Sequence, residues 1–589
     1  YIGDKSNANT DSSLVATKRS LIYNELSKEL YKKFFLTYDE KQASKDGYIY
    51  IHDLNSRLDS FNCDLFRVGK VMKGGFEMGN LWYNEPNYLD TAFDVMGDII
   101  LSTAAQQYGG FTVPEVDKML VPYARKSYKK YKKEYTSILL EIVSPSKINQ
   151  YKTKIKKYAL DKLQRDFEQG WQGIEMKLNS VGSSRGDYPF VSMSLGLATS
   201  KFGKMASISL LKVHSEGQGK KGFKRPVLFP KIIFLYDKNL HGDGSPEYPN
   251  ADVFNAGIDC SSKTMYPDWL SLTGKGYVPE MYKKYGRIVS PMGCRAFLSP
   301  WYEKGGMHPA DEEDKPVFEG RCNLGVVSLH LPMILAKARR EGKDFYEVLD
   351  YYLEMIRNLH KRTYDYIGQL RASVNPVAFC EGGLYGGNLN PNDKIKSILP
   401  PMTMSYGITA LNELQRLYNG KSIREDGEFA LETMRYIQSY IDRIKEEDHI
   451  LYAIYGTPAE SLCGLQIEQF RKIYGIVENV SDREYVSNSF HCHVSENMSP
   501  IEKQDKEERF WNYFNGGKIQ YCRYNLGYNK EAIKTLILRA MDKGFYEGVN
   551  LAMCYCEDCG YQQVEMDVCP KCGSSMITKI DRMNGLRTK

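Results

Sequence analysis

The sequence predicts an α/β protein with one large domain followed by a small metal-binding module. Segments in which apolar residues recur at helical spacing alternate with short runs rich in β-branched and aromatic residues, and this alternation is typical of α/β folds. Near the C-terminus four cysteines stand in two close pairs, which is typical of a zinc module. The simplest partition is a large domain over residues 1–545 and a module over residues 546–589.

The clearest helical patterns lie in residues 86–109 and 345–362. Both place apolar side chains on one face, and Gly109 supplies a C-terminal stop signal for the first. Strands are expected at Val227–Tyr236, Leu324–Leu331 and Phe490–Val494. The last of these would put His491 and His493 on one strand face, which is an incomplete metal site.

Composition indicates a soluble globular protein, with 42% hydrophobic and 26% charged residues. No stretch approaches the roughly 20 apolar residues that span a bilayer, and no secretory signal is visible. A net charge of +6 is only weak support for nucleic-acid binding. The thirteen cysteines do not resemble a disulfide framework, because those outside the zinc spacing are scattered singly. We therefore expect a cytoplasmic, reducing location.

Arg125–Lys133 carries lysines along one helical face. Two interpretations stay open: a solvated helix face, or a surface that attracts the phosphates of a nucleotide.

The cysteine spacing is Cys556-x2-Cys559-x9-Cys569-x2-Cys572. Two such pairs complete a shell of four thiolates, which leaves no position for water or substrate. We therefore predict a structural zinc ion. Taken alone, the site is also compatible with a zinc ribbon that binds nucleic acid.

Arg582-Met-Asn-Gly585 follows the zinc site closely. Asn-Gly is a common turn signal, and taken alone the turn is the simpler interpretation. Glycine is also suited to carry a backbone radical, since its α-carbon has no side chain and can become planar.

Further motifs appear in order along the chain: Ser290-Pro-Met-Gly-Cys294-Arg-Ala-Phe-Leu, Gly320-Arg-Cys-Asn323-Leu-Gly, Tyr455-Gly-Thr-Pro-Ala-Glu460-Ser461 and Asn488-Ser-Phe-His. With the four cysteines and Arg582-Met-Asn-Gly585, they resemble the anaerobic (class III) ribonucleoside-triphosphate reductases, in particular phage-type members. The resemblance covers essentially the whole chain. It implies a glycyl radical enzyme that makes deoxyribonucleoside triphosphates, the precursors of DNA.

The resemblance also implies a structure and a mechanism. The fold would be a ten-stranded α/β barrel with a central finger loop that carries Cys294. A separate activase, using S-adenosylmethionine and an iron–sulfur cluster, would remove a hydrogen atom from Gly585. The radical would pass to Cys294, and the resulting thiyl would abstract the 3′-hydrogen of the substrate ribose.

Two more residues match the active site of the family. Cys63 would face the 2′ side of the ribose and take part in its reduction. Asn323 stands where other reductase classes have a glutamate; an amide cannot act as a general base, but it can hydrogen-bond sugar hydroxyls or a small carboxylate. In the family this pairing goes with formate as the reductant.

The segment Pro400-Pro-Met-Thr-Met-Ser405-Tyr-Gly407 is expected to be a loop that leads into a helix, where unpaired amides attract phosphate. The resemblance places substrate phosphates at Ser405, Tyr406 and Gly407. It further implies a homodimer whose specificity is controlled by deoxynucleotide effectors. Residues 1–150 would hold this dimer and effector region, with 86–109 and the lysine-rich helix after it as candidates.

Two alternatives compete with this interpretation. A relative of the formate lyases would use two adjacent cysteines in the finger loop, whereas Cys294 stands between Gly293 and Arg295. A zinc-ribbon protein would need a basic surface near the zinc site. Residues 554–572 instead contain four acidic residues and Lys571 as the only lysine or arginine.

Overall fold

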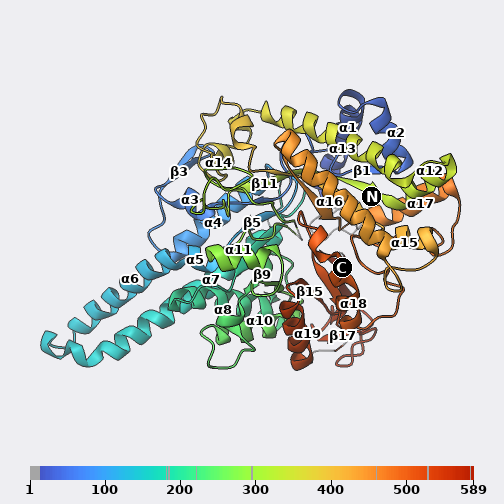
Figure 1. The fold of residues 1–589 in the computed structure, drawn as a ribbon. Coiled ribbons are helices and arrows are strands. Elements are labelled where there is room, and N and C mark those ends of the chain that lie inside the picture. Colours follow the sequence, from blue (N-terminus) through green and yellow to red (C-terminus); the bar gives the residue numbers. More distant parts are fainter. Residues whose placement is uncertain are drawn as a thin grey trace.

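The structure, a computed structural model, describes residues 14–180, 182–183, 186–220, 222–293, 296–458, 461–524, 526, 529–583 and 586–588. A central sheet surrounded by helices forms the body, and a long helical hairpin projects from it (Figure 1). The hairpin consists of α6 (Val121–Leu140) and α7 (Lys152–Ser180). No helix in the described ranges is long and apolar enough to cross a membrane.

Ten strands of the large sheet form two parallel halves that run in opposite directions. The first half contains β2 (Asp64–Leu65), β5 (Phe111–Val113), β6 (Val191–Leu195), β9 (Lys231–Tyr236) and β10 (Asp268–Ser271). The second contains β11 (Arg321–His330), β12 (Thr403–Thr409), β13 (Leu451–Gly456), β14 (Gln520–Arg523) and β15 (Tyr546–Asn550). The halves meet in antiparallel pairs, β2 with β11 and β10 with β15. β1 (Ile49–Ile51) pairs antiparallel with Val327–Leu329, the C-terminal part of β11.

The ring closes between the two ends of this path. Tyr455 on β13 bridges in parallel to Gly517, just before β14. The Gly516 amide donates to the Ile454 carbonyl at 2.7 Å, and the Gly456 amide donates to the Gly517 carbonyl at 2.8 Å. A Cβ on Gly516 would lie 2.7 Å from the Cβ of Ala453, so this approach requires glycine. The sheet is therefore a closed ten-stranded barrel, as expected.

Helices cover the outside of the barrel. α4 (Leu89–Ala104), α6, α7, α8 (Lys201–Glu216), α10 (Ala251–Thr264) and α19 (Lys530–Asp542) pack beside the first half and its junction with β15. α12 (Leu331–Glu341), α13 (Phe345–Gly368), α15 (Leu411–Asn419), α16 (Glu428–Asp448) and α17 (Leu462–Tyr474) belong to the second half. Apolar side chains of helices and strands form one large buried core.

Both helices predicted from periodicity are confirmed, with shifted ends. The segment 86–109 contains α4, which stops at Ala104, and the segment 345–362 lies within α13. α13 starts where the Asp344 side chain accepts hydrogen bonds from the amides of Tyr346 and Glu347. Gly109 does not end the helix. A Cβ there would meet the Asn62 backbone, so this glycine permits a close chain approach.

Two of the three strand predictions are confirmed. β9 begins only after Pro230, which cannot donate to a ladder, and β11 begins earlier than expected, at Arg321. The strand predicted at Phe490–Val494 is wrong. Ser489 has φ +49°, and the His491 amide donates to the Asn488 carbonyl, so the chain turns here. His491 and His493 consequently share no strand face.

The small C-terminal sheet contains β16 (Met553–Cys556), β17 (Gln562–Val564), β18 (Ile577–Met583) and β19 (Leu586–Thr588). β15 belongs to the barrel, so the passage from the large sheet to the small one lies between Asn550 and Met553 rather than at residue 545.

Candidate active site

A finger loop enters the barrel between β10 and β11. After α11 (Tyr277–Tyr285) the chain forms a narrow tip, in which Met292 and Ala296 exchange backbone hydrogen bonds at 2.7 and 3.0 Å. Buried apolar residues of the loop, including Met292 and Leu298, pack against Leu65, Val326 and Tyr455 of the barrel wall. Cys294, the residue expected to form the thiyl, follows Gly293 and lies outside the described residues.

Side chains from the barrel wall hold the finger tip. The Ser192 hydroxyl on β6 donates to the Gly293 carbonyl at 3.0 Å. The Gly293 amide donates to the Thr112 hydroxyl on β5 at 3.3 Å. Gly293 has φ +53°, a conformation that favours glycine. Both backbone polar groups of Gly293, the residue before Cys294, are thus hydrogen-bonded to the barrel wall.

Gly110 and Cys63 lie directly against this tip. The Gly110 amide donates to the Cys63 sulfur at 3.1 Å. A Cβ on Gly110 would lie 2.6 Å from Gly293 Cα, and a Cβ on Gly293 would lie 3.1 Å from Cys63 Sγ. The structure therefore places Cys63 beside the residue that precedes Cys294. Gly110 was not identified from the sequence, although the pair Gly109-Gly110 after a helix is the signal of such a close approach.

Asn323 joins the same cluster through the backbone. Its amide donates to the Cys63 carbonyl, and the Asn62 amide donates to the Asn323 carbonyl, both at 2.8 Å. The buried Asn323 side chain donates from Nδ2 to the Ser405 hydroxyl at 2.7 Å, and its Oδ1 accepts from the Gly325 amide at 2.9 Å. Both ends of the side-chain amide are held, which fixes its orientation.

The expectation of a loop at Ser405–Gly407 is wrong, because these residues lie in the middle of β12. Side chains alternate along a strand, and Tyr406 points to the face opposite Ser405. Its ring packs against His360 and Tyr452, with centroids 5.2 and 5.8 Å away. Burial raises the pKa of Tyr406 well above its usual value. Ser405 therefore lies on the same side of β12 as Asn323, together with Gly407, whereas Tyr406 lies behind the strand.

A group of hydroxyls beside Gly407 was not identified from the sequence. His52 Nε2 lies 2.8 Å from the Ser328 hydroxyl, which lies 2.8 Å from the Thr457 hydroxyl. A Cβ on Gly407 would overlap both hydroxyl oxygens. Burial, and secondarily the charge of Arg57, lowers the pKa of His52 to about 3, so its imidazole is neutral at pH 7.

The four cysteines predicted to bind zinc come together. The sulfur atoms of Cys556, Cys559, Cys569 and Cys572 all lie within 4.8 Å of one another. In each pair a glycine with positive φ follows the second cysteine, and its amide donates to the carbonyl of the first: Gly560 to Cys556 at 3.0 Å and Gly573 to Cys569 at 2.8 Å. The donor set fits a tetrahedral structural zinc ion.

Side-chain contacts, in addition to the chain connection, attach the small sheet to the barrel. Arg225, in the hairpin of β7 (Gln218–Lys220) and β8 (Phe223–Arg225), forms an ion pair with Glu557. Its guanidinium also lies 4.9 Å from the Tyr555 ring centroid. β18 pairs with β19, and Met583 lies opposite Leu586. Gly585 lies outside the described residues.

Comparison with known proteins gives a consistent result. The profile of the family described as "Anaerobic ribonucleoside-triphosphate reductase" matches residues 6–588. The enzyme of that name from Haemophilus influenzae is 31% identical over 588 residues, covering 98% of this chain and 78% of its own length. That of Enterobacteria phage T4 is 29% identical, covering 99% of this chain and 92% of its own.

A crystal structure of the anaerobic ribonucleotide reductase from Thermotoga maritima, with dATP bound in its specificity site, has a TM-score of 0.68. It covers 97% of this chain and 89% of its own at 14% sequence identity. This likeness confirms the predicted fold class.

We predict about one bound zinc ion per chain, with Cys556, Cys559, Cys569 and Cys572 as ligands. Cys572→Ser should abolish stoichiometric zinc and expose residues after 550 to limited proteolysis, because the small sheet surrounds the metal site. Cys554→Ser is the matched control: this buried cysteine accepts from the Met566 amide and lies outside the group of four. Equal zinc in Cys572→Ser and the unmodified chain, measured by mass spectrometry of the metal, would contradict the assignment.

Proposed function

The chain belongs to the family of anaerobic ribonucleoside-triphosphate reductases, and on that premise we propose that it uses glycyl and thiyl radicals with formate as the reductant. Family membership sets aside the formate-lyase relative and the zinc-ribbon protein that the sequence left open. The observation that carries the proposal is the contact of the finger tip with Cys63 at the barrel centre. It provides a sulfur atom beside Gly293, the residue that precedes the expected thiyl residue.

In the proposed reaction a radical S-adenosylmethionine activase with an iron–sulfur cluster removes a hydrogen atom from Gly585. The Gly585 radical takes the hydrogen of the Cys294 thiol, and the thiyl abstracts the 3′-hydrogen of the ribose. The 2′-hydroxyl leaves as water after protonation, for which Cys63 is the donor. Formate supplies two electrons and becomes carbon dioxide, and the 3′-hydrogen returns. Overall, a ribonucleotide, formate and a proton give a deoxyribonucleotide, carbon dioxide and water.

Asn323 is the proposed contact for formate and the sugar. One Nδ2 hydrogen is used by Ser405 and one Oδ1 lone pair by Gly325. A side-chain amide has a second hydrogen and a second lone pair, and these remain for a ligand. Because Asn323 is neutral, it can donate to the formate anion without repelling it.

For the substrate phosphates we propose the inward face of β12 and its neighbours. Ser405 and Gly407 share this face with the hydroxyls of Ser328 and Thr457. The strands β12 and β13 lead directly toward α15 and α17, whose starting amides favour anions. Tyr406 is assigned to packing behind the strand rather than to phosphate contact.

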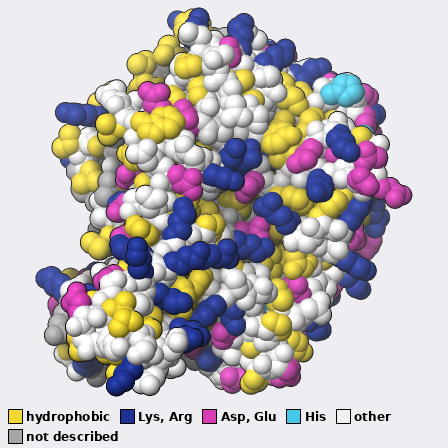
Figure 2. All heavy atoms as spheres, turned by 90° about the vertical axis from the view of Figure 1, so that its left-hand side faces the viewer, with side chains coloured by type: hydrophobic (Ala, Val, Ile, Leu, Met, Phe, Trp, Pro, Cys, Tyr) yellow, Lys and Arg dark blue, Asp and Glu magenta, His cyan; other side chains and the backbone are white. Residues whose placement is uncertain are grey.

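For the effectors we propose a site at a homodimer interface built from α4, α6 and α7. α6 carries four exposed lysines: Lys126, Lys129, Lys130 and Lys133. Lys126 forms a surface ion pair with Glu85 at 3.7 Å. Lysine and arginine side chains form a band across this side of the molecule (Figure 2). The structurally similar Thermotoga maritima enzyme has dATP in a specificity site. A basic surface attracts the phosphate groups of such a nucleotide.

Removing the Asn323 amide tests the formate assignment. In Asn323→Ala we expect formate-dependent CTP reduction to fall about 100-fold or more, the scale for one oriented hydrogen-bond donor at a reacting group. Asn323→Asp keeps the size but adds a negative charge, so the KM for formate should rise. Labelled formate should give one carbon dioxide per dCTP. Undiminished activity in Asn323→Ala, or dCTP formation without formate oxidation, would overturn this assignment.

Adding a methyl group at Gly110 tests the finger-tip contact. The Cβ of Gly110→Ala would lie 2.6 Å from Gly293 Cα, so the tip must move. We expect turnover to fall about 100-fold, since displacement by about 1 Å has this effect on aligned reactants. Gly173→Ala is the matched control, because nothing lies within 4 Å of its added Cβ. Equal turnover in both variants, with folding checked by circular dichroism, would speak against the contact.

A further inference from the structure

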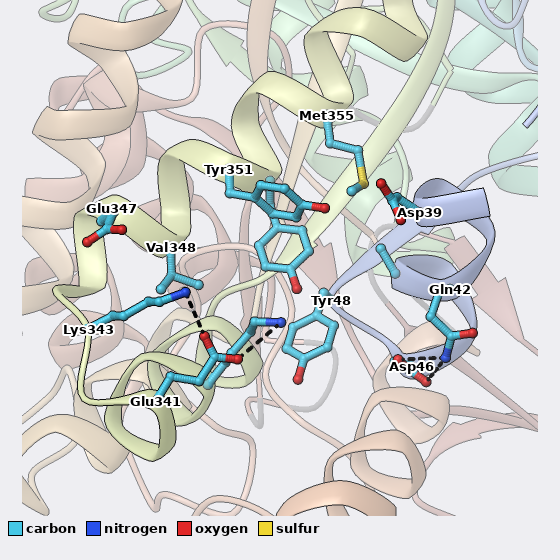
Figure 3. A pocket seen from close by; sticks show the side chains of 13 residues that line it. Asp39, Gln42, Asp46, Tyr48, Glu341, Lys343, Glu347, Val348, Tyr351 and Met355 are labelled. Carbon is cyan, nitrogen blue, oxygen red and sulfur yellow. Dashed lines mark hydrogen bonds and ion pairs between the residues drawn. The ribbon is translucent and has the colours of Figure 1, made fainter. Parts of the chain in front are cut away.

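A pocket of about 380 Å³ lies on the outside of the barrel, away from the finger loop (Figure 3). Three helices build it: α2 (Tyr38–Asp46), the C-terminal end of α12 and the first turns of α13. Acidic residues and tyrosines line it, among them Asp39, Asp46, Tyr48, Glu347, Tyr351 and Tyr352.

Three tyrosines form the middle of the pocket. The rings of Tyr48 and Tyr352 stack with centroids 5.0 Å apart, and Tyr351 meets Tyr352 edge to face at 5.1 Å. Lys337 already lies over the Tyr48 ring, at 5.0 Å. Tyr351 is 52% exposed, and among the described residues no lysine or arginine lies over its ring. The pocket therefore offers an open aromatic face to a cation.

The Tyr352 hydroxyl is a further polar group of the pocket. This side chain is only 2% exposed, and it lines the pocket. The Tyr48 hydroxyl is paired with that of Tyr474 at 2.5 Å, whereas the Tyr352 hydroxyl has no hydrogen-bond partner within the described ranges. It can therefore accept a hydrogen bond from a donor that enters the pocket.

The carboxylates around the pocket are only partly neutralised. Glu341 is paired with Lys337 at 3.5 Å and with Lys343 at 3.2 Å. Asp39, Asp46 and Glu347 have no ion pair in the part of the chain that the structure describes; Asp46 accepts only from Gln42, at 2.8 and 2.9 Å. α2 ends at Asp46 and α12 at Glu341, and helix C-termini add partial negative charge.

The arrangement of these charges selects the shape of the cation. Asp39 and Asp46 lie on one side of the pocket and Glu341 and Glu347 on the other, with Tyr48 and Tyr351 between them (Figure 3). A divalent metal ion needs several oxygen ligands that converge on one point. Within the described ranges only the four zinc-site cysteines converge in this way. An elongated cation with charge at both ends matches this separation of the carboxylates.

We propose that this pocket binds a linear aliphatic polyamine. One ammonium group pairs with Asp39 and donates toward the Tyr352 hydroxyl, while Asp46, one end of α2 away, adds attraction at longer range. The methylene chain lies over Tyr351 and Met355, and the second ammonium group pairs with Glu347. The inference does not depend on the proposed reductase chemistry.

Calorimetric titration of the full chain with spermidine at low ionic strength tests this site. We expect saturable binding of one spermidine per chain. Asp39→Asn with Asp46→Asn should weaken binding about tenfold, because the ion pair with Asp39 and the longer-range attraction of Asp46 are both lost. Glu312→Gln with Glu313→Gln is the charge-matched control, since these exposed residues do not line the pocket. Absence of saturable binding, or equal weakening in the control, overturns the proposal.

Two further measurements keep the test decisive if the double variant is unstable. Tyr352→Phe removes the hydroxyl and keeps the ring, and we expect about threefold weaker binding with an unchanged melting temperature. Butylamine carries a single ammonium group and should bind at least about tenfold more weakly than spermidine. Full affinity in Tyr352→Phe together with equal affinity for butylamine would mean that no two-ended site exists.

Discussion

The site depends on one contact, the approach of two backbone segments at the barrel centre. Gly110 comes so close to Gly293 that it cannot carry a side chain, Gly293 has a positive φ that favours glycine, and the sulfur of Cys63 lies beside both. Without this contact the finger tip could not lie against the wall. Ser192 and Thr112 then fix the tip by hydrogen bonds to both polar groups of Gly293. Groups on three different strands or strand ends thus hold Gly293, the residue before Cys294.

Barrel closure explains why these groups meet. The antiparallel junction of β2 and β11 connects the backbone of Cys63 to that of Asn323, which joins the two halves of the site. The bulge between Asn323 and Gly325 turns the Asn323 side chain toward Ser405 on the next strand. Within the second half, Gly516 and Gly517 close the ring against β13, and the Gly516 carbonyl accepts from the Phe297 amide of the finger loop at 3.0 Å. The β2–β11 junction therefore supports Cys63 and Asn323, and the closure against β13 supports the finger loop.

The elements that could be predicted from the sequence are those whose signal is local. The two segments with helical periodicity contain α4 and lie within α13, and the four cysteines at zinc spacing form a compact group. Each of these features depends mainly on residues that are close along the chain. The prediction of a loop around Ser405 was wrong, since Gly407 and its polar neighbours are residue types that also occur in turns. Inside a closed barrel, small polar residues can line the inner face of a strand, where a ligand rather than a side chain fills the space. Gly110, Ser328 and Thr457 were missed because only the tertiary fold brings them to the site.

The most direct test of this account is electron paramagnetic resonance under strict anaerobiosis. The chain would be incubated with a cognate radical activase, S-adenosylmethionine and a reductant. The account predicts a doublet that collapses with α-deuterated glycine and is absent in Gly585→Ala. Cys294→Ala should keep the doublet but form no deoxynucleotide. A radical that persists in Gly585→Ala, or deoxynucleotide formation by Cys294→Ala, would contradict the path from Gly585 through Cys294 to the substrate.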